Sequence, residues 1–185
     1  MSRPRSAQAV KLVMSIFSAN WRDIGVTIGT LAVHFGKPDF IGAGMPFTET
    51  DYYEREMGAS LIRRLVSFAA LVRPEALPDI KNLTQRIETR YAEGERRRVN
   101  IDPGYISPSH LILATGKGYS HRPYLRDGIY ADLTLIFENG TFRPLPWTYP
   151  DYAGRSITAL MNRVREKYLL DLRSEAGPSG KEEDP

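Results

Sequence analysis

The stretch IYADLTLIFENGTF, residues 129–142, decides the fold class. Apolar side chains occupy every second position of its first nine residues, the period of a strand with one buried face: Ile129, Ala131, Leu133, Leu135 and Phe137. The pair Asn139-Gly140 then predicts a two-residue hairpin. Asp127-Gly128 predicts a second hairpin, which returns to residues 121–125. Residues 121–145 therefore predict a three-strand antiparallel meander.

Upstream of this region, six elements follow one another in a β-α-β-β-α-β order. Apolar residues three and four positions apart predict the helices, and short apolar runs predict the strands. The order is typical of ferredoxin-like split βαβ units, whose antiparallel sheet carries helices on one face. The predicted ranges are strand 10–17, helix 21–35, strands 39–44 and 61–72, helix 74–94 and strand 96–101.

The remaining segments complete the prediction. Asp102-Pro103-Gly104 predicts a turn, because proline presets one backbone dihedral and glycine supplies the unusual one. Ser107-Pro108-Ser109 predicts the cap of a short helix over residues 110–115, and an apolar stripe predicts a closing helix over residues 154–172. The predicted fold class is α+β: a ferredoxin-like β-α-β-β-α-β start, a short helix, the meander and a C-terminal helix.

The chain of 185 residues is long enough for one domain with a substantial core. We expect that domain to cover residues 10–173, and we expect the N-terminus 1–9 and the acidic tail 174–185 to be disordered. No apolar run approaches the roughly 20 residues that a membrane helix needs. Residues 1–9 also lack the apolar centre of a secretory signal. By elimination, the expected location is the cytoplasm, with no membrane partner.

Cysteine and charge content narrow the classes of function. The chain has no cysteine, which excludes disulfides, thiolate metal sites and a cysteine nucleophile. Its net charge is +3, and residues 174–185 hold four acids and one lysine, so residues 1–173 carry +6. This balance favours an anionic ligand or a nucleic acid as partner.

Several common catalytic motifs are missing. The chain contains no G-x-x-x-x-G-K-[ST] loop, and no G-x-G-x-x-G opens a helix after a strand. The three histidines stand alone at His34, His110 and His121, so we predict no metal ligands and no structural zinc. No resident cofactor is predicted. A Mg²⁺ ion would come with a phosphorylated ligand, held by carboxylates such as Asp102 and Asp127.

Polar and charged side chains concentrate between residues 96 and 130, at predicted strand ends and turns, where a rigid scaffold displays binding residues. Arginine and lysine suit phosphate and carboxylate groups, while aspartate and histidine can move protons. The candidate catalytic residues are Asp102, His121 and Asp127, and the candidate ligand-binding residues are Arg97, Asn100, Tyr105, Lys117, Arg122 and Tyr130. The structural alternative is a solvated basic edge whose aspartates form turns, and for Asp127 that interpretation is the stronger one.

Four stretches resemble an uncharacterised prokaryotic family, domain of unknown function 4416. They are DYYEREMG (51–58), RRVNIDPGY (97–105), HRPYLRDGIYA (121–131) and PLPWTYPDY (144–152). The resemblance covers about residues 10–172, and its long motifs occur in the family's order. It implies no established activity, so function has to be argued from the residues.

The leading hypothesis is a domain that binds a small anionic or nucleotide-like, phosphorylated ligand, either as a binding protein or as an enzyme acting on it. One alternative is an RNA- or DNA-binding module that uses the basic edge and the tyrosines. A second is a protein-interaction or assembly subunit with aromatic loops as its contact. If the candidate residues line one pocket, the small-ligand hypothesis is favoured over the other two. Phosphate should then raise the melting temperature, and Arg122→Ala should abolish that rise at little cost in stability.

Overall fold

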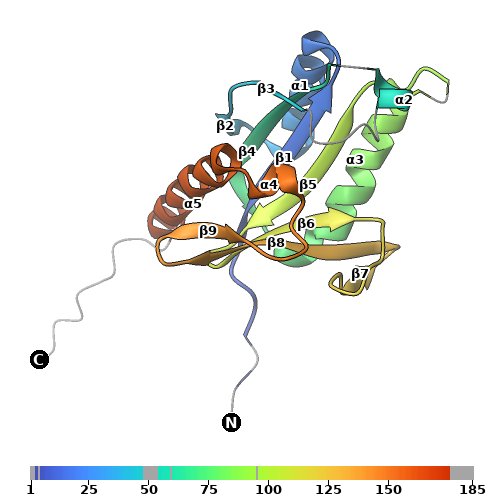
Figure 1. Cartoon of the computed structure of the whole chain (residues 1–185). Coiled ribbons are helices and arrows are strands. Elements are labelled where there is room, and N and C mark those ends of the chain that lie inside the picture. The colour runs from blue at the N-terminus through green and yellow to red at the C-terminus, as the bar shows by residue number, and fades with distance from the viewer. Residues whose placement is uncertain (1–2, 4, 48–53, 59, 95, 176–185) are drawn as a thin grey trace, which may run out of the picture.

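The computed structural model describes residues 3, 5–47, 54–58, 60–94 and 96–175. These residues form an α+β fold around one nine-stranded antiparallel sheet (Figure 1), which confirms the predicted class. The sheet order is β2-β4-β1-β5-β6-β8-β7, with β3 paired to β4 and β9 paired to β8. The strands are β1 (Val10–Ser18), β2 (Pro38–Ile41), β3 (Met45–Pro46), β4 (Ile62–Val72), β5 (Asn100–Ile106), β6 (His110–Thr115), β7 (Tyr124–Arg126), β8 (Ile129–Glu138) and β9 (Thr141–Pro144).

The helices pack on both faces of this sheet. They are α1 (Trp21–Phe35), α2 (Glu54–Met57), α3 (Leu77–Tyr91, after a 3-10 turn at Pro74–Ala76), α4 (Pro150–Ala153) and α5 (Arg155–Glu175). Side chains of β1 alternate between the two faces. Leu12 and Met14 pack in one core cluster with residues of α1 and α3, whereas Val13 packs in a second cluster with α4 and α5. The expectation of helices on one face therefore holds for α1 and α3 only (Figure 1).

The predicted short helix over residues 110–115 is wrong, because these residues form strand β6. Ser107 explains the error. Its hydroxyl accepts hydrogen bonds from the backbone N–H groups of Ser109 and His110 at 3.3 and 3.0 Å, inside the tight connection between β5 and β6. The same side-chain-to-backbone hydrogen bonds occur at helix N-termini and in turns. The serine residues therefore did not show whether a helix or a turn follows.

The predicted turn at Asp102-Pro103-Gly104 is also wrong, since all three residues lie inside β5. β6 begins to pair with β5 only at Gly104, so a single neighbouring strand accompanies β5 at Pro103. Proline is tolerated at such one-sided positions. A Cβ atom on Gly104 would lie 2.4 Å from the Ile112 carbonyl oxygen, so glycine allows β6 to approach closely.

The predicted meander forms with a different arrangement. β7 and β9 both pair with β8, as expected, and β6 pairs with β8 as well. Residues Tyr130 and Leu135 of β8 each pair with β6, so β7 and β9 must share the opposite edge of β8, one at each end. The strand order of a simple meander is therefore not observed.

The expected domain limits can be compared with the structure only in part. α5 continues to Glu175, two residues beyond the expected limit at 173. Residues 176–185 and 1–2 lie outside the described residues. Residues 5–9 form no helix or strand, and the Tyr168 hydroxyl donates to the Ala9 carbonyl at 2.7 Å. Across the described ranges, no helix has the length and apolar character needed to cross a membrane.

Candidate functional site

The sheet divides between β5 and β6. β5 pairs with β1 along its whole length, but it pairs with β6 only from Gly104 to Ile106. β6 meanwhile continues along β8 as far as Thr115. Residues 100–103 of β5 and 114–115 of β6 therefore separate from one another, and we call this place the fork.

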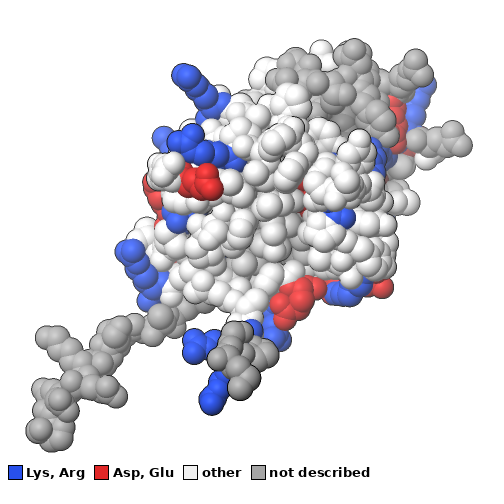
Figure 2. Space-filling model, turned by 60° about the horizontal axis from the view of Figure 1, so that its bottom comes forward, with Lys and Arg blue, Asp and Glu red and all other residues white. Residues whose placement is uncertain are grey.

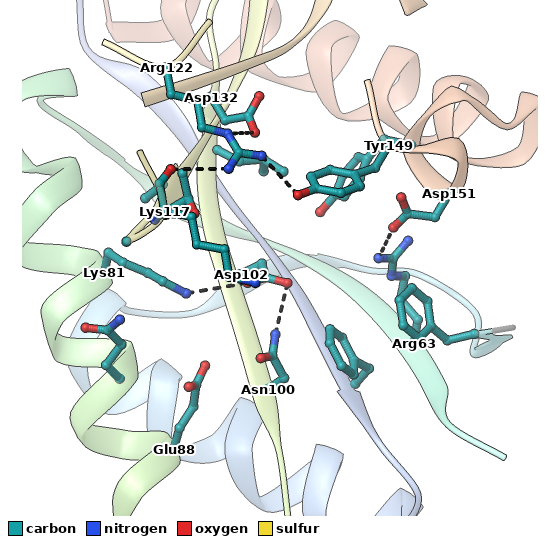
Figure 3. A pocket seen from close by; sticks show the side chains of 18 of the residues that line it. Arg63, Lys81, Glu88, Asn100, Asp102, Lys117, Arg122, Asp132, Tyr149 and Asp151 are labelled. Carbon is teal, nitrogen blue, oxygen red and sulfur yellow. Dashed lines mark hydrogen bonds and ion pairs between the residues drawn. The ribbon is translucent and has the colours of Figure 1, made fainter. Parts of the chain in front are cut away.

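A cavity of about 690 Å³ lies at the fork (Figure 3). Small-molecule sites occupy roughly 300–1,000 Å³, so the cavity has the size of a ligand site. Its walls come from α3 on one face of the sheet and from α4 on the other. The charged residues that line it are the cations Arg63, Lys81, Arg97, Lys117 and Arg122 and the acids Glu88, Asp102, Asp132 and Asp151.

Two side chains of α3 replace the strand that is missing at the fork. The Lys81 ammonium donates to the Ile101 carbonyl at 3.0 Å, and the Ile101 N–H donates to Glu88 Oε1 at 2.6 Å. These are main-chain groups that a continuing β6 would otherwise satisfy. Burial raises the pKa of Glu88, because its charged form loses hydration; nearby Lys81 offsets a part of this rise. The cavity can thus interrupt the sheet without leaving these backbone groups unpaired.

Asp102 joins the polar side chains of the cavity wall. Its carboxylate accepts from Asn100 Nδ2 at 2.9 Å and lies 3.4 Å from the Lys81 ammonium (Figure 3). Asn100 Oδ1 in turn accepts from Arg97 at 3.0 Å, and Arg97 donates twice to Glu56 at 2.6 and 2.7 Å. These bonds from Arg97 lower the pKa of Glu56. The network holds the side chains of β5 in fixed orientations toward the cavity.

Arg122 forms the upper wall in Figure 3 and is paired in three directions. It donates to Asp132 at 2.8 Å, to the Lys117 carbonyl at 3.2 Å and to the Tyr149 hydroxyl at 3.0 Å. Burial opposes its charge, but the Tyr149 hydrogen bond and the Asp132 carboxylate outweigh burial and raise the pKa of Arg122. Because Arg122 and Asp132 are both buried and paired, the structure leads us to expect a loss of stability from Arg122→Ala, in place of the small cost expected from the sequence.

Arg63 and Tyr152 form the opposite wall. Arg63 is 4% exposed, donates to Asp151, and places its guanidinium 4.4 Å from the ring centre of Phe47 and 5.0 Å from that of Tyr152. Burial raises the pKa of Tyr152, and the positive charge of Arg63 offsets part of the rise. The Tyr152 phenol keeps its proton at neutral pH and can donate a hydrogen bond.

Three buried polar atoms on this side lack a partner among the residues that the structure describes. They are Arg63 Nε, the Tyr152 hydroxyl and the Ser15 hydroxyl, and Ser15 lies opposite Asp102 in the β1–β5 register. A buried donor without an acceptor costs about 1–3 kcal/mol. Such groups in a native structure call for a ligand, an ion or a water molecule as partner.

Five of the nine residues proposed from the sequence line the cavity: Arg97, Asn100, Asp102, Lys117 and Arg122. The other four lie elsewhere. Tyr105 packs against the cluster of Leu77, Ala114 and Ile129, and burial raises its pKa. Tyr130 stacks edge-on against Tyr124 at 5.2 Å.

Asp127 and His121 also lie outside the cavity lining. Asp127 has a positive φ of 54°, pairs with Arg126 at 2.5 Å and forms the turn between β7 and β8. The imidazole of His121 stacks on Trp147 at 5.1 Å and contacts Tyr119 at 5.2 Å. Its Nε2 is buried and makes no hydrogen bond to any described residue. The placement of Asp127 agrees with a structural role in the turn, whereas the buried Nε2 of His121 is a further polar atom without a partner among the described residues, outside the cavity lining.

The sequence did not single out three important lining residues, Arg63, Lys81 and Glu88. Asp151 and Tyr152 were noted only as part of the stretch PLPWTYPDY and not as site residues. Arg63 is a charged residue at a buried position of the largely apolar strand β4. Lys81 and Glu88 lie seven residues apart, two turns along one face of α3. In each case the sequence offered one signal for a functional residue: a charged side chain among the apolar positions of a buried face. In the described part of the chain, no group of three or more histidine, cysteine, aspartate or glutamate side chains is arranged to hold a metal ion.

The fold and the site define an α+β domain with a charged cavity where its sheet divides. The chain belongs to the family described as a domain of unknown function, DUF4416, whose sequence profile matches residues 8–168. The resemblance expected from the four quoted stretches is thereby confirmed. Three of these stretches contribute to the cavity lining, through Asn100, Arg122 and Tyr149 for example, and the fourth contains Glu56, the partner of Arg97. No curated protein and no solved structure matches the chain.

Proposed function

We propose that the cavity at the fork binds a small anionic ligand that carries a phosphate group. The observation that carries this proposal is the set of buried donors without partners on the Arg63 wall, namely Arg63 Nε and the Tyr152 hydroxyl. A phosphate offers several acceptor oxygens, and charge-assisted hydrogen bonds from arginine are among the strong ones. The additional cations in the lining favour the same charge sign in the ligand.

The test uses variants that remove one unpartnered hydroxyl each. Tyr152→Phe removes a hydroxyl at the cavity, and Thr27→Val removes one from α1, which contributes no residue to the cavity lining. Because each hydroxyl is buried without a partner, neither variant should lose stability through a broken hydrogen bond. Phosphate should raise the melting temperature of the wild type and of Thr27→Val, and the rise should be clearly smaller in Tyr152→Phe.

Melting curves measured with millimolar phosphate, with sulfate and with chloride at equal ionic strength give the answer. If phosphate does not shift the wild-type midpoint beyond the chloride control, the proposal fails. It also fails if Tyr152→Phe and Thr27→Val respond to phosphate equally.

A nucleic-acid interface is the competing proposal, and the arrangement of charges gives it less support. The candidate cations gather in a concave site, and on the face shown in Figure 2 both signs of charge lie around the margin of a broad uncharged area. Titration with a random single-stranded oligonucleotide separates the two. A steep loss of affinity with added salt would favour the nucleic acid.

We also infer that the first half of the chain is a ferredoxin-like unit. Two features support this assignment: the chain order β1-α1-β2-β4-α3-β5 and the antiparallel sheet order β2-β4-β1-β5. The cavity would then lie where this unit meets the added strands β6 to β9. A solved structure of a relative would test the assignment. A different order of these four strands in that structure would contradict it.

A further inference from the structure

The carboxylates of the cavity raise a question that an anionic ligand alone does not answer. Four acids share the lining with five cations. Two of the acids are paired with buried arginines, Asp132 with Arg122 and Asp151 with Arg63. Their charges are compensated inside the protein, so they neither attract nor strongly repel a ligand.

Asp102 differs from those two acids. Its side chain is 30% exposed, and it receives one hydrogen bond from Asn100 at 2.9 Å and a longer contact from Lys81 at 3.4 Å. An ionised carboxylate has about four acceptor positions. Asp102 therefore faces the cavity with acceptor capacity that its protein partners do not fill.

This carboxylate shares the cavity lining with the unpartnered donors of Arg63 and Tyr152. Asp102 is directly opposite Ser15 on the neighbouring strand, and its charge contributes to the raised pKa of Tyr152. A bare phosphate beside Asp102 would meet a like charge. A ligand whose phosphate contacts Arg63 and Tyr152, and whose hydroxyl groups donate to Asp102, satisfies both sets of atoms.

We propose that the ligand is a phosphate ester of a polyhydroxylated compound, with the phosphate toward Arg63 and Tyr152 and the hydroxyls donating to Asp102. This inference rests on the proposed phosphate binding and adds the second half of the ligand. The volume of about 690 Å³ supports it, because it exceeds what a single phosphate ion occupies. Asn100 and Gln85, which also line the cavity, supply amide groups for further hydroxyls.

The experiment is calorimetric titration of the full chain with methyl phosphate, ribose 5-phosphate, 2-deoxyribose 5-phosphate and adenosine 5′-phosphate. Ribose 5-phosphate should bind at least tenfold more tightly than methyl phosphate, and the deoxy compound should fall between the two. If adenosine 5′-phosphate binds more tightly still, the hydroxyls belong to a nucleoside; if it binds less tightly, they belong to a sugar phosphate.

Asp102→Asn tests the residue itself. It removes the charge, so it should weaken ribose 5-phosphate at least tenfold and leave methyl phosphate as tight or tighter. The matched control is Asp79→Asn, an exposed acid at the start of α3, and it should change neither affinity. The comparison of ligands on the wild type stands even if Asp102→Asn does not fold.

The outcomes separate this inference from the proposed function. If methyl phosphate binds and added hydroxyls bring no gain, the polyol assignment is overturned while phosphate binding stands. Equal weakening of both ligands by Asp102→Asn would likewise overturn it, because Asp102 would then only hold the cavity in shape. If no phosphate compound binds, both proposals fail.

Discussion

Two groups of buried charges lie on this sheet, and they are built differently. The first, which we call the Lys11 cluster, closes on itself: Lys11, Asp39, Ser67, Lys167 and Asp171. Lys11 is fully buried and lies 2.9 Å from Asp39 and 2.6 Å from Asp171, and it also donates to the Phe68 carbonyl at 3.0 Å. Two cations face two carboxylates. Burial would raise the pKa of Asp39, but hydrogen bonds from Ser67 and the two lysines outweigh burial and lower it.

The second group lines the cavity at the fork, and not all of its polar atoms are paired within the protein. Its Arg63 Nε and Tyr152 hydroxyl have no partner among the described residues, and Asp102 is partly exposed. The Lys11 cluster fastens α5 to β1 and β2 with every charge compensated, as a structural role requires. Charges of the same types are paired with one another in the Lys11 cluster, whereas at the fork some polar groups are left without a protein partner, which is the basis of the proposed ligand site.

The largest effect should come from opening the Lys11 cluster. Lys11→Met leaves Asp39 and Asp171 without their central cation in a buried position. Removing one partner of a buried ion pair typically costs about 3–5 kcal/mol. Urea denaturation should show a loss of that size, and phosphate should not restore it. A loss below about 1 kcal/mol would mean that the cluster is well hydrated.

A smaller loss is expected at the closed part of the cavity. Arg122→Ala leaves the buried Asp132 unpaired, and the loss of a hydrogen bond to a charged group costs about 1.5–3 kcal/mol. Water in the cavity can reach Asp132, so the loss should stay below that of Lys11→Met. If Arg122→Ala is as stable as the wild type in urea, the Arg122–Asp132 pair does not stabilise the fold, and Arg122 then resembles the unpaired groups of the cavity and not the charges of the Lys11 cluster.

Glu88 provides a pH-dependent test. Its pKa is raised by burial above the ordinary 4.5, with Lys81, Arg97 and Asp102 as the charged neighbours. The native state therefore binds more protons than the unfolded state at pH values above 4.5, so this group destabilises the fold as pH rises through that window. Glu88→Gln lacks this titration. The stability of the variant relative to the wild type should increase with pH from about 4.5 upward in urea denaturation, and a pH-independent difference would contradict the raised pKa.

The smallest effect is expected at Asp127. Asp127→Asn keeps a residue that tolerates the positive φ of 54° and removes a charge from an exposed pair with Arg126. We expect neither the melting temperature nor the phosphate-induced rise to change measurably. A lost phosphate response would return Asp127 to the site, as the sequence originally suggested.

The sequence predicted elements well where a periodic pattern was long. The helix over 21–35 and the strand over 61–72 agree with α1 and β4 to within a residue. The errors fall where short polar motifs have two uses. Ser107 caps a hairpin connection instead of a helix, and Gly104 permits close strand contact instead of a turn. Local signals describe the backbone bonds of a residue but not which neighbour will supply them.

The site divides in the same way. The sequence by itself determined that cations and polar side chains gather around residues 97–122, because their chemistry is visible in the residue types. Only the tertiary structure decided that Arg97, Asp102 and Arg122 face one cavity while Asp127 lies outside its lining. It also brought in Arg63 and Tyr152, 89 positions apart in the chain, whose meeting depends on how β4 and α4 pack. Burial and pairing of a side chain are properties of the assembled sheet, and no local pattern encodes them.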